Sequence, residues 1–114
     1  MNRRYRLTKS TDFKRVRRTG KSYAHPLVIL VASPNDRLIS RFGVTAGRAL
    51  GSAVQRNRAK RLLREALRSY LTAIAGGWDV VLIARSALIE AEWNDVCSAV
   101  ANLLRRAGLL EEAS

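Results

Sequence analysis

Residues 53–68 read AVQRNRAKRLLREALR, and this stretch decides more of the fold than any other. Apolar side chains recur in and beyond it at three- and four-residue spacing, which predicts a long amphipathic helix over 53–75, ended by Gly76 and Gly77. At about 100° per residue, the apolar stripe lies opposite an arc of roughly 120°. The side chains on that arc are Arg58, Arg61, Arg64 and Arg68, with Asn57 among them. One face of the helix therefore packs on a core, and the other presents a ridge of positive charge.

Shorter elements flank this helix. Thr8 or Ser10 is expected to cap a first helix that stops at Gly20. The turn at 33–36 makes the strands on either side of it antiparallel neighbours in a meander. After the long helix, a further apolar run crosses back into the same sheet. The predicted elements are helices over 10–19, 53–75 and 93–104, and strands over 21–24, 27–32, 39–45 and 79–84.

Length and composition indicate one folded domain. With 114 residues, 47% of them hydrophobic, the chain should bury roughly 65% of its unfolded surface without help from disulfides or metal. Its single Cys and single His cannot build a disulfide framework or a four-ligand zinc site. We therefore expect one domain over 1–114 with flexible ends at about 1–6 and 106–114, and we interpret Trp78, Trp93 and Cys97 as core residues.

The charge is strongly positive and unevenly placed. The formal net charge is +12, and residues 1–21 hold nine Lys or Arg against one acid, while residues 48–68 hold seven against one. Segregated positive charge destabilises a compact chain unless a polyanion neutralises it, so we expect a phosphate-bearing partner. No signal peptide or membrane-spanning run is recognisable, which favours the cytoplasm and argues against a membrane partner.

The cationic helix suits structured RNA in particular. Guanidinium forks bind phosphate oxygens in pairs, and an asparagine can read a base edge or a ribose hydroxyl. Arg56 and Lys60 lie nearer the apolar side of the helix, but in its first turns, where long side chains can reach a ligand. Glu65 is the only acid in the helix, so most of these charges lack a partner within it.

The segment from Gly51 to Glu65 resembles the RNR motif of the bacterial ribonuclease P protein subunit. Supporting matches appear in the family's order, and together they cover roughly residues 5–104. They are Asp12-Phe13-x-x-Val16, Gly20, Phe42-Gly43-Val44 and residues 79–85. The resemblance implies an α/β (α+β) fold, a two-layer sandwich of αβββαβα order with a sheet of about four strands. It also implies a left-handed βαβ crossover at the RNR helix.

The resemblance implies a function without catalytic side chains in this chain. In the family, a catalytic RNA uses Mg²⁺ to remove the 5′ leader of precursor tRNA, and the protein binds both RNAs and needs no protein partner. The residues implied to contact the catalytic RNA are Arg48, Arg56, Asn57, Arg58, Lys60, Arg61, Arg64 and Arg68. The residues implied to contact the leader, in a cleft between the first helix and the sheet, are Phe13, Lys14, Arg17 and Tyr23.

The chain departs from the family near that cleft. Many members have aromatic residues where this chain has Arg17 and Leu30, and a second basic residue where it has Ala49. Phe13 and Arg17, four residues apart on one helix face, still offer stacking and a cation for a single strand. Phe13 as an ordinary core residue remains the alternative, and His25 is expected to be a surface or structural residue.

Other functions compete with this one. A ribosomal-type or other structured-RNA-binding module without processing activity is the main alternative. A protein-only nuclease would need clustered carboxylates or a histidine-based acid and base, and Asp12, Asp36 and Asp79 are isolated along the sequence. Attachment to a membrane surface would need the leucine face of the long helix, which is required to cover the sheet.

Overall fold

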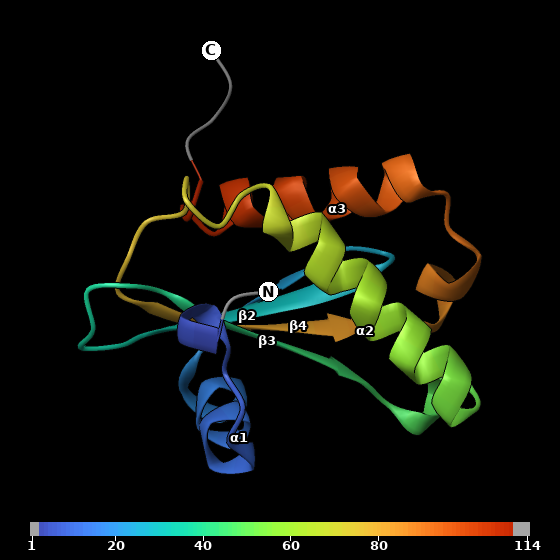
Figure 1. The fold of residues 1–114 in the computed structure, drawn as a ribbon, viewed down its shortest axis with the longest axis horizontal. Coiled ribbons are helices and arrows are strands. Elements are labelled where there is room, and N and C mark those ends of the chain that lie inside the picture. Colours follow the sequence, from blue (N-terminus) through green and yellow to red (C-terminus); the bar gives the residue numbers. More distant parts are fainter. Residues whose placement is uncertain (1–2, 111–114) are drawn as a thin grey trace.

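A computed structural model describes residues 3–110. Four strands form one mixed sheet, and three α-helices pack on it, so the predicted α+β class and the αβββαβα order are confirmed (Figure 1). The α-helices are α1 (Ser10–Thr19), α2 (Ala53–Arg68) and α3 (Trp93–Arg106), and the strands are β1 (Lys21–Ala24), β2 (Val28–Pro34), β3 (Arg41–Ala46) and β4 (Trp78–Ala84). Short 3-10 turns lie at Arg3–Tyr5, Arg48–Leu50 and Ser86–Glu90.

The strand order in the sheet is β1-β2-β4-β3. β2 pairs antiparallel with β1 and with β4, and β3 pairs parallel with β4. The predicted meander is therefore wrong, because β4 lies between β2 and β3. Val80, Val81 and Leu82 of β4 are all fully buried, and a strand that is apolar on both faces gains most in a central position. The long α2 crossover then joins the parallel strands β3 and β4.

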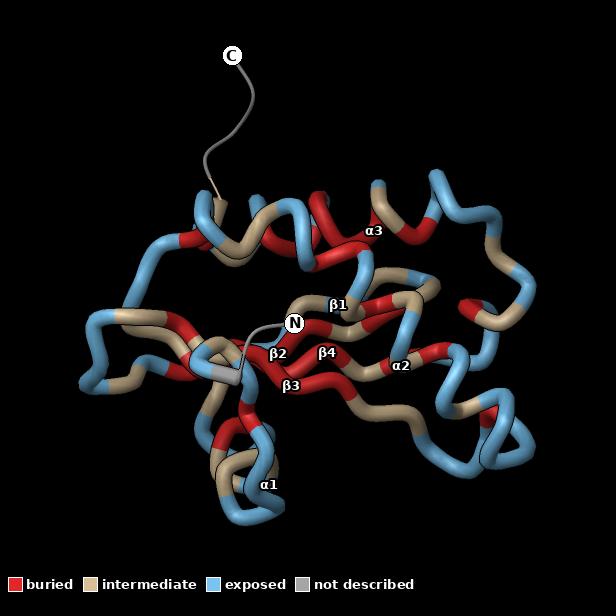
Figure 2. Tube along the Cα trace, in the orientation of Figure 1, coloured by how far each residue is buried: buried red, intermediate tan, exposed pale blue. Residues whose placement is uncertain are grey.

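Helices cover both faces of the sheet. On one face, α2 and α3 enclose the main core, which includes Leu30, Phe42 and Leu82. On the other, α1 sets Val16 against Val31 and Val81, and Figure 2 shows the buried strands between these layers. The sheet with α2 and α3 makes the predicted sandwich, and α1 adds cover on the opposite face.

Local signals explain the starts of the helices better than their ends. α2 begins with a capping box in which Gln55 N donates to Ser52 Oγ at 3.3 Å and Ser52 N donates to Gln55 Oε1 at 2.9 Å. The expectation that α2 reaches residue 75 is wrong, since the helix ends at Arg68 and turns follow it. Tyr70, Leu71 and Ile74 still pack on the core from those turns, which is why their spacing looked helical.

Two further expectations need correction, while others hold. α1 spans the predicted residues and stops at Gly20, but its N-cap is Lys9, which makes no side-chain capping bond. Trp78 and Cys97 pack against the core as expected, whereas Trp93 is 43% exposed. The flexible ends predicted at 1–6 and 106–114 lie partly outside the described residues, and within them Leu7 and Leu109 are buried. No helix within 3–110 is long and apolar enough to cross a membrane.

Candidate nucleic-acid interface

The RNR residues lie on α2 as the wheel predicts. Ala59, Leu63, Ala66 and Leu67 are buried against the sheet and α3. Opposite them, Asn57, Arg58, Arg61 and Arg68 are exposed, and Arg48 is exposed in the 3-10 turn ahead of the helix. Arg56, Lys60 and Arg64 are half-buried. The cationic ridge is therefore a surface feature, formed because the apolar stripe fixes the rotation of the helix.

One flank of α2 faces α1. Arg56, Lys60 and Arg64 follow each other at four-residue spacing, and Lys60 lines a groove shared with α1. Burial lowers the pKa of Arg64, and the positive charge of Arg6 lowers it further. Both side chains still carry their charge at neutral pH, so the fold holds two like charges near each other. An anion at this flank would relieve that repulsion.

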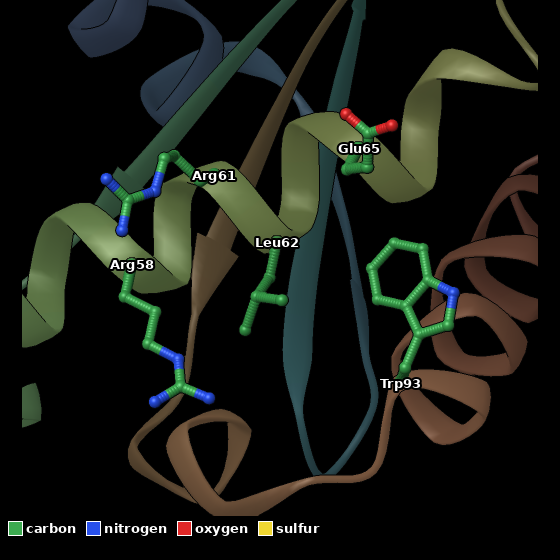
Figure 3. A pocket seen from close by; sticks show the side chains of 5 residues that line it. All are labelled: Arg58, Arg61, Leu62, Glu65 and Trp93. Atoms are coloured by element: carbon green, nitrogen blue, oxygen red, sulfur yellow. The ribbon is translucent and has the colours of Figure 1, made fainter.

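The opposite flank of α2 faces the start of α3. Arg58 and Arg61 line a pocket of about 470 Å³ together with Leu62, Glu65 and Trp93 (Figure 3). The one ion pair that α2 forms among residues 3–110 joins Arg68 to Glu65 at 3.4 Å, and Arg56 donates to the Gly51 carbonyl at 2.9 Å. The charges of Arg58 and Arg61 are thus available to a ligand.

The groove between α1 and the sheet brings together three of the four residues implied for the leader. It has a volume of about 410 Å³, and Phe13, Lys14 and Arg17 line it from α1. The remaining residues that line it are Thr8, Ser10, Val44, Thr45, Ala46 and Lys60. The Phe13 ring lies directly over Gly43, where an added Cβ would collide with it. The groove thus combines an aromatic side chain and three cations.

Tyr23 does not join this groove. Its cross-strand partner is Leu30, and paired residues point to the same face of a sheet. Leu30 is fully buried in the core under α2 and α3, and Tyr23 packs on that same core. Phe13 packs on the other face with Val31 and Val81. Tyr23 is therefore separated from Phe13 by the sheet, and the substitution at Leu30 does not alter the groove.

A buried carboxylate network fixes α1 in place, and the sequence analysis missed it. The Asp79 side chain is fully buried, and it accepts hydrogen bonds from Arg15 of α1, from Arg41 of β3 and from Asn35. Asp12 joins through Arg15 at 3.5 Å and Arg41 at 3.9 Å. Asp12 and Asp79, far apart in sequence, thus share two arginines. The one sequence signal was an acid at the start of an apolar strand, which needs a buried partner.

The electrostatics of this network favour the charged form of Asp79. Burial alone raises the pKa of the carboxyl, but hydrogen bonds from Arg41, Asn35 and Arg15 outweigh it, so the pKa of Asp79 lies below its ordinary value. The same pairing raises the pKa of Arg41. Asp79 is therefore an acceptor committed to arginines, which suits a structural role.

Other polar groups have structural rather than chemical surroundings. The Leu27 N–H donates to His25 Nδ1 at 3.1 Å, which ties the histidine into the turn between β1 and β2. Within the part of the chain that the structure describes, no three His, Cys, Asp or Glu residues group closely enough to hold a metal ion. The arrangement as a whole is suited to binding phosphate and bases.

Comparison with known proteins agrees with this geometry. The sequence model of the family described as Ribonuclease P matches residues 1–108. The ribonuclease P protein component of Roseiflexus castenholzii is 45% identical over 114 residues, covering 99% of this chain and 93% of that protein. The RNase P protein of Staphylococcus aureus superposes with a TM-score of 0.85 at 27% identity, covering 94% of this chain and 98% of that one. That of Thermotoga maritima gives 0.80 at 32% identity, covering 89% and 96%. With the match extending over nearly its whole length, the chain belongs to the ribonuclease P protein family.

Proposed function

We propose that this chain is the RNA-binding subunit of ribonuclease P and assists the catalytic RNA in removing the 5′ leader of precursor tRNA by an endonucleolytic cut. The observation that carries the proposal is the presence of two cationic surfaces on one rigid domain. One is the exposed face of α2, and the other is the groove beside α1. A protein with two such surfaces can hold two RNAs at once.

The face of α2 is the proposed contact for the catalytic RNA. Its cations are the residues of the RNR motif and Arg48, and they project from a helix whose other side is anchored in the core. Rigid guanidinium groups bind phosphate oxygens with little loss of side-chain freedom, and Asn57 adds a group that can read a base or ribose.

The groove is the proposed contact for the leader. A single strand is bound without strict sequence preference by a stacking platform within a positive channel. Phe13 supplies the ring, and Lys14, Arg17 and Lys60 supply the charge. Lys60 also belongs to the RNR motif, so the two surfaces meet at this residue. Such a meeting point places the leader beside the catalytic RNA.

The proposed division of labour leaves the chemistry to the RNA. Mg²⁺ is assigned to the RNA subunit, because Asp79, the buried acid of this chain, is committed to two arginines and an asparagine. Two RNAs repel each other strongly, and Mg²⁺ or a cationic protein can offset that repulsion. Bound to both, the protein would lower the Mg²⁺ concentration that cleavage requires. We place this activity in the cytoplasm, without a membrane or further protein partner.

The test is cleavage of precursor tRNA across a range of Mg²⁺ concentrations for RNA alone, protein alone and both together. We expect no cleavage by the protein alone and a lower Mg²⁺ requirement for the complex. Cleavage by an RNA-free protein preparation would overturn the division of labour. Identical Mg²⁺ curves with and without protein would favour the alternative, a ribosomal-type or other structured-RNA-binding module, and selective binding of ribosomal RNA would then identify it.

A further inference from the structure

Trp93, the first residue of α3, differs from the other large apolar residues of that helix. It is 43% exposed, whereas Val96, Val100 and Leu103 are fully buried. An indole in contact with water loses much of the free energy that burial of its large apolar surface would give. Trp93 therefore presents a ring at the surface, where a ligand can cover it.

The exposed indole forms one wall of the pocket between α2 and α3. Figure 3 shows Trp93 on one side, Arg58 and Arg61 on the other, and Leu62 between them. Leu62 is half-buried and gives the pocket an apolar floor. The volume of about 470 Å³ lies within the range of about 300–1,000 Å³ that is usual for small-ligand sites.

Charge divides the pocket into two halves. On the α2 side, Arg58 and Arg61 form no ion pair within residues 3–110. On the α3 side, Glu92 and Asp95 flank the indole in sequence and are exposed, so an anion is disfavoured there. A ligand that fits both halves has a flat apolar ring at one end and a negative charge at the other.

We propose that this pocket receives one unpaired nucleotide of the catalytic RNA, with its base stacked on Trp93 and its phosphates on Arg58 and Arg61. The proposal rests on the proposed function, which supplies the RNA partner. Bases that leave a helix stack on aromatic side chains in this way. Glu65, at the edge of the pocket, can accept a hydrogen bond from the amino group of a base, which favours cytosine, adenine or guanine over uracil.

The first test compares the affinities of Trp93→Ala and Trp93→Phe for the ribonuclease P catalytic RNA. We expect Trp93→Ala to weaken binding by roughly 5- to 100-fold, the range that loss of one stacked base gives, and Trp93→Phe to restore most of it. The matched control is Leu38→Ala, which removes a side chain that is 98% exposed and lies outside the pocket, and which should bind within twofold of wild type. Affinity unchanged in Trp93→Ala would overturn the proposal.

A second readout works even if Trp93→Ala fails to fold. Trp78→Phe leaves Trp93 as the only tryptophan, and its fluorescence should fall, and its access to acrylamide decrease, when the catalytic RNA binds. Fluorescence and access that do not change at saturating RNA would remove the nucleotide from this pocket. If Arg61→Ala weakens RNA binding while Trp93→Ala does not, the pocket proposal fails and the proposed function stands. If the wild-type protein does not bind the catalytic RNA, the proposed function itself fails.

Discussion

Arg41 and Asp79 are cross-strand neighbours in the parallel pair of β3 and β4, and they are joined by two hydrogen bonds. Arg41 Nε donates to Asp79 Oδ1 at 3.0 Å and Nη2 donates to Oδ2 at 2.8 Å. Arg15 of α1 donates to the same carboxylate. The pair therefore connects the edge strand, the neighbouring strand and the helix that carries Phe13, and it sets the width of the groove.

Replacing this carboxylate should destabilise the protein. Asp79→Asn leaves the charges of Arg15 and Arg41 without their buried partner, and we expect the free energy of unfolding to fall by about 1–3 kcal/mol at pH 7. Urea denaturation measures the change. The control is Asp36→Asn, which removes an exposed carboxylate beside the same network and should change the free energy of unfolding little. Equal stability of Asp79→Asn and wild type would show that the network contributes nothing net.

The same carboxylate should make stability depend on acid. Because the pKa of Asp79 is lower in the folded protein than in the unfolded chain, its contribution is fully present above about pH 4. The contribution is lost as the pH falls through the lower, folded-state pKa. Urea denaturation from pH 6 down to pH 2.5 should therefore show a smaller loss for Asp79→Asn than for wild type. Parallel curves for the two proteins would contradict this assignment.

Gly43 and Phe13 should be coupled. A Cβ at Gly43 would collide with the Phe13 ring, so Gly43→Ala is expected to displace the ring and to lower the free energy of unfolding by about 1–3 kcal/mol. In a Phe13→Ala background the same substitution should cost less, because the ring is gone. Denaturation of the two single variants and the double variant measures the coupling. Additive losses would mean that the contact between ring and glycine is not the cause.

Sequence alone predicts those parts of this fold that depend on local pattern. Gly20 and the spacing of Phe13 and Val16 define α1, and the apolar stripe of α2 orients the RNR side chains. The order of strands is not local, because residues 33–36 specify a turn without specifying which strands become neighbours. Likewise, the apolar spacing of Tyr70 and Ile74 does not distinguish a helix from turns that pack on the same core.

The site shows the same division. That Arg58 and Arg61 are exposed follows from periodicity, since the opposite face of α2 must be buried. Tyr23 could be placed on the wrong side of the sheet because its face depends on the register with Leu30, which sequence does not reveal. The partners of Asp79 lie 38 and 64 residues away, so only the three-dimensional structure brings them together.

The face of α2 should bind the catalytic RNA mainly through phosphates. Arg61→Ala should weaken binding without unfolding the domain, because Arg61 is exposed. The slope of log affinity against log salt should shrink by roughly 0.7 to 0.9 for each phosphate that the variant no longer neutralises. Filter binding at several salt concentrations measures it, with Arg37→Ala as the control for an exposed arginine away from α2. The same weakening in both variants would indicate a general effect of net charge and no specific interface on α2.

The groove should distinguish precursor from mature tRNA, because only the precursor has a leader to place in it. Phe13→Ala removes the stacking ring while Lys14, Arg17 and Lys60 remain, so we expect the complex with the catalytic RNA to lose about 1–3 kcal/mol of affinity for a precursor with a leader of several nucleotides. Affinity for mature tRNA should stay nearly unchanged.

Phe13 is half-buried and packs beside Val16, Val31 and Val81, so a structural effect must be separated from a binding effect. Phe13→Leu keeps an apolar side chain over Gly43 but has no ring to stack on a base. If the ring binds the leader, Phe13→Leu should fold with nearly wild-type stability and still bind precursor more weakly than wild type. If Phe13 serves only as a core residue, Phe13→Leu will bind precursor and mature tRNA as wild type does, because the cations of the groove would then hold the leader without stacking.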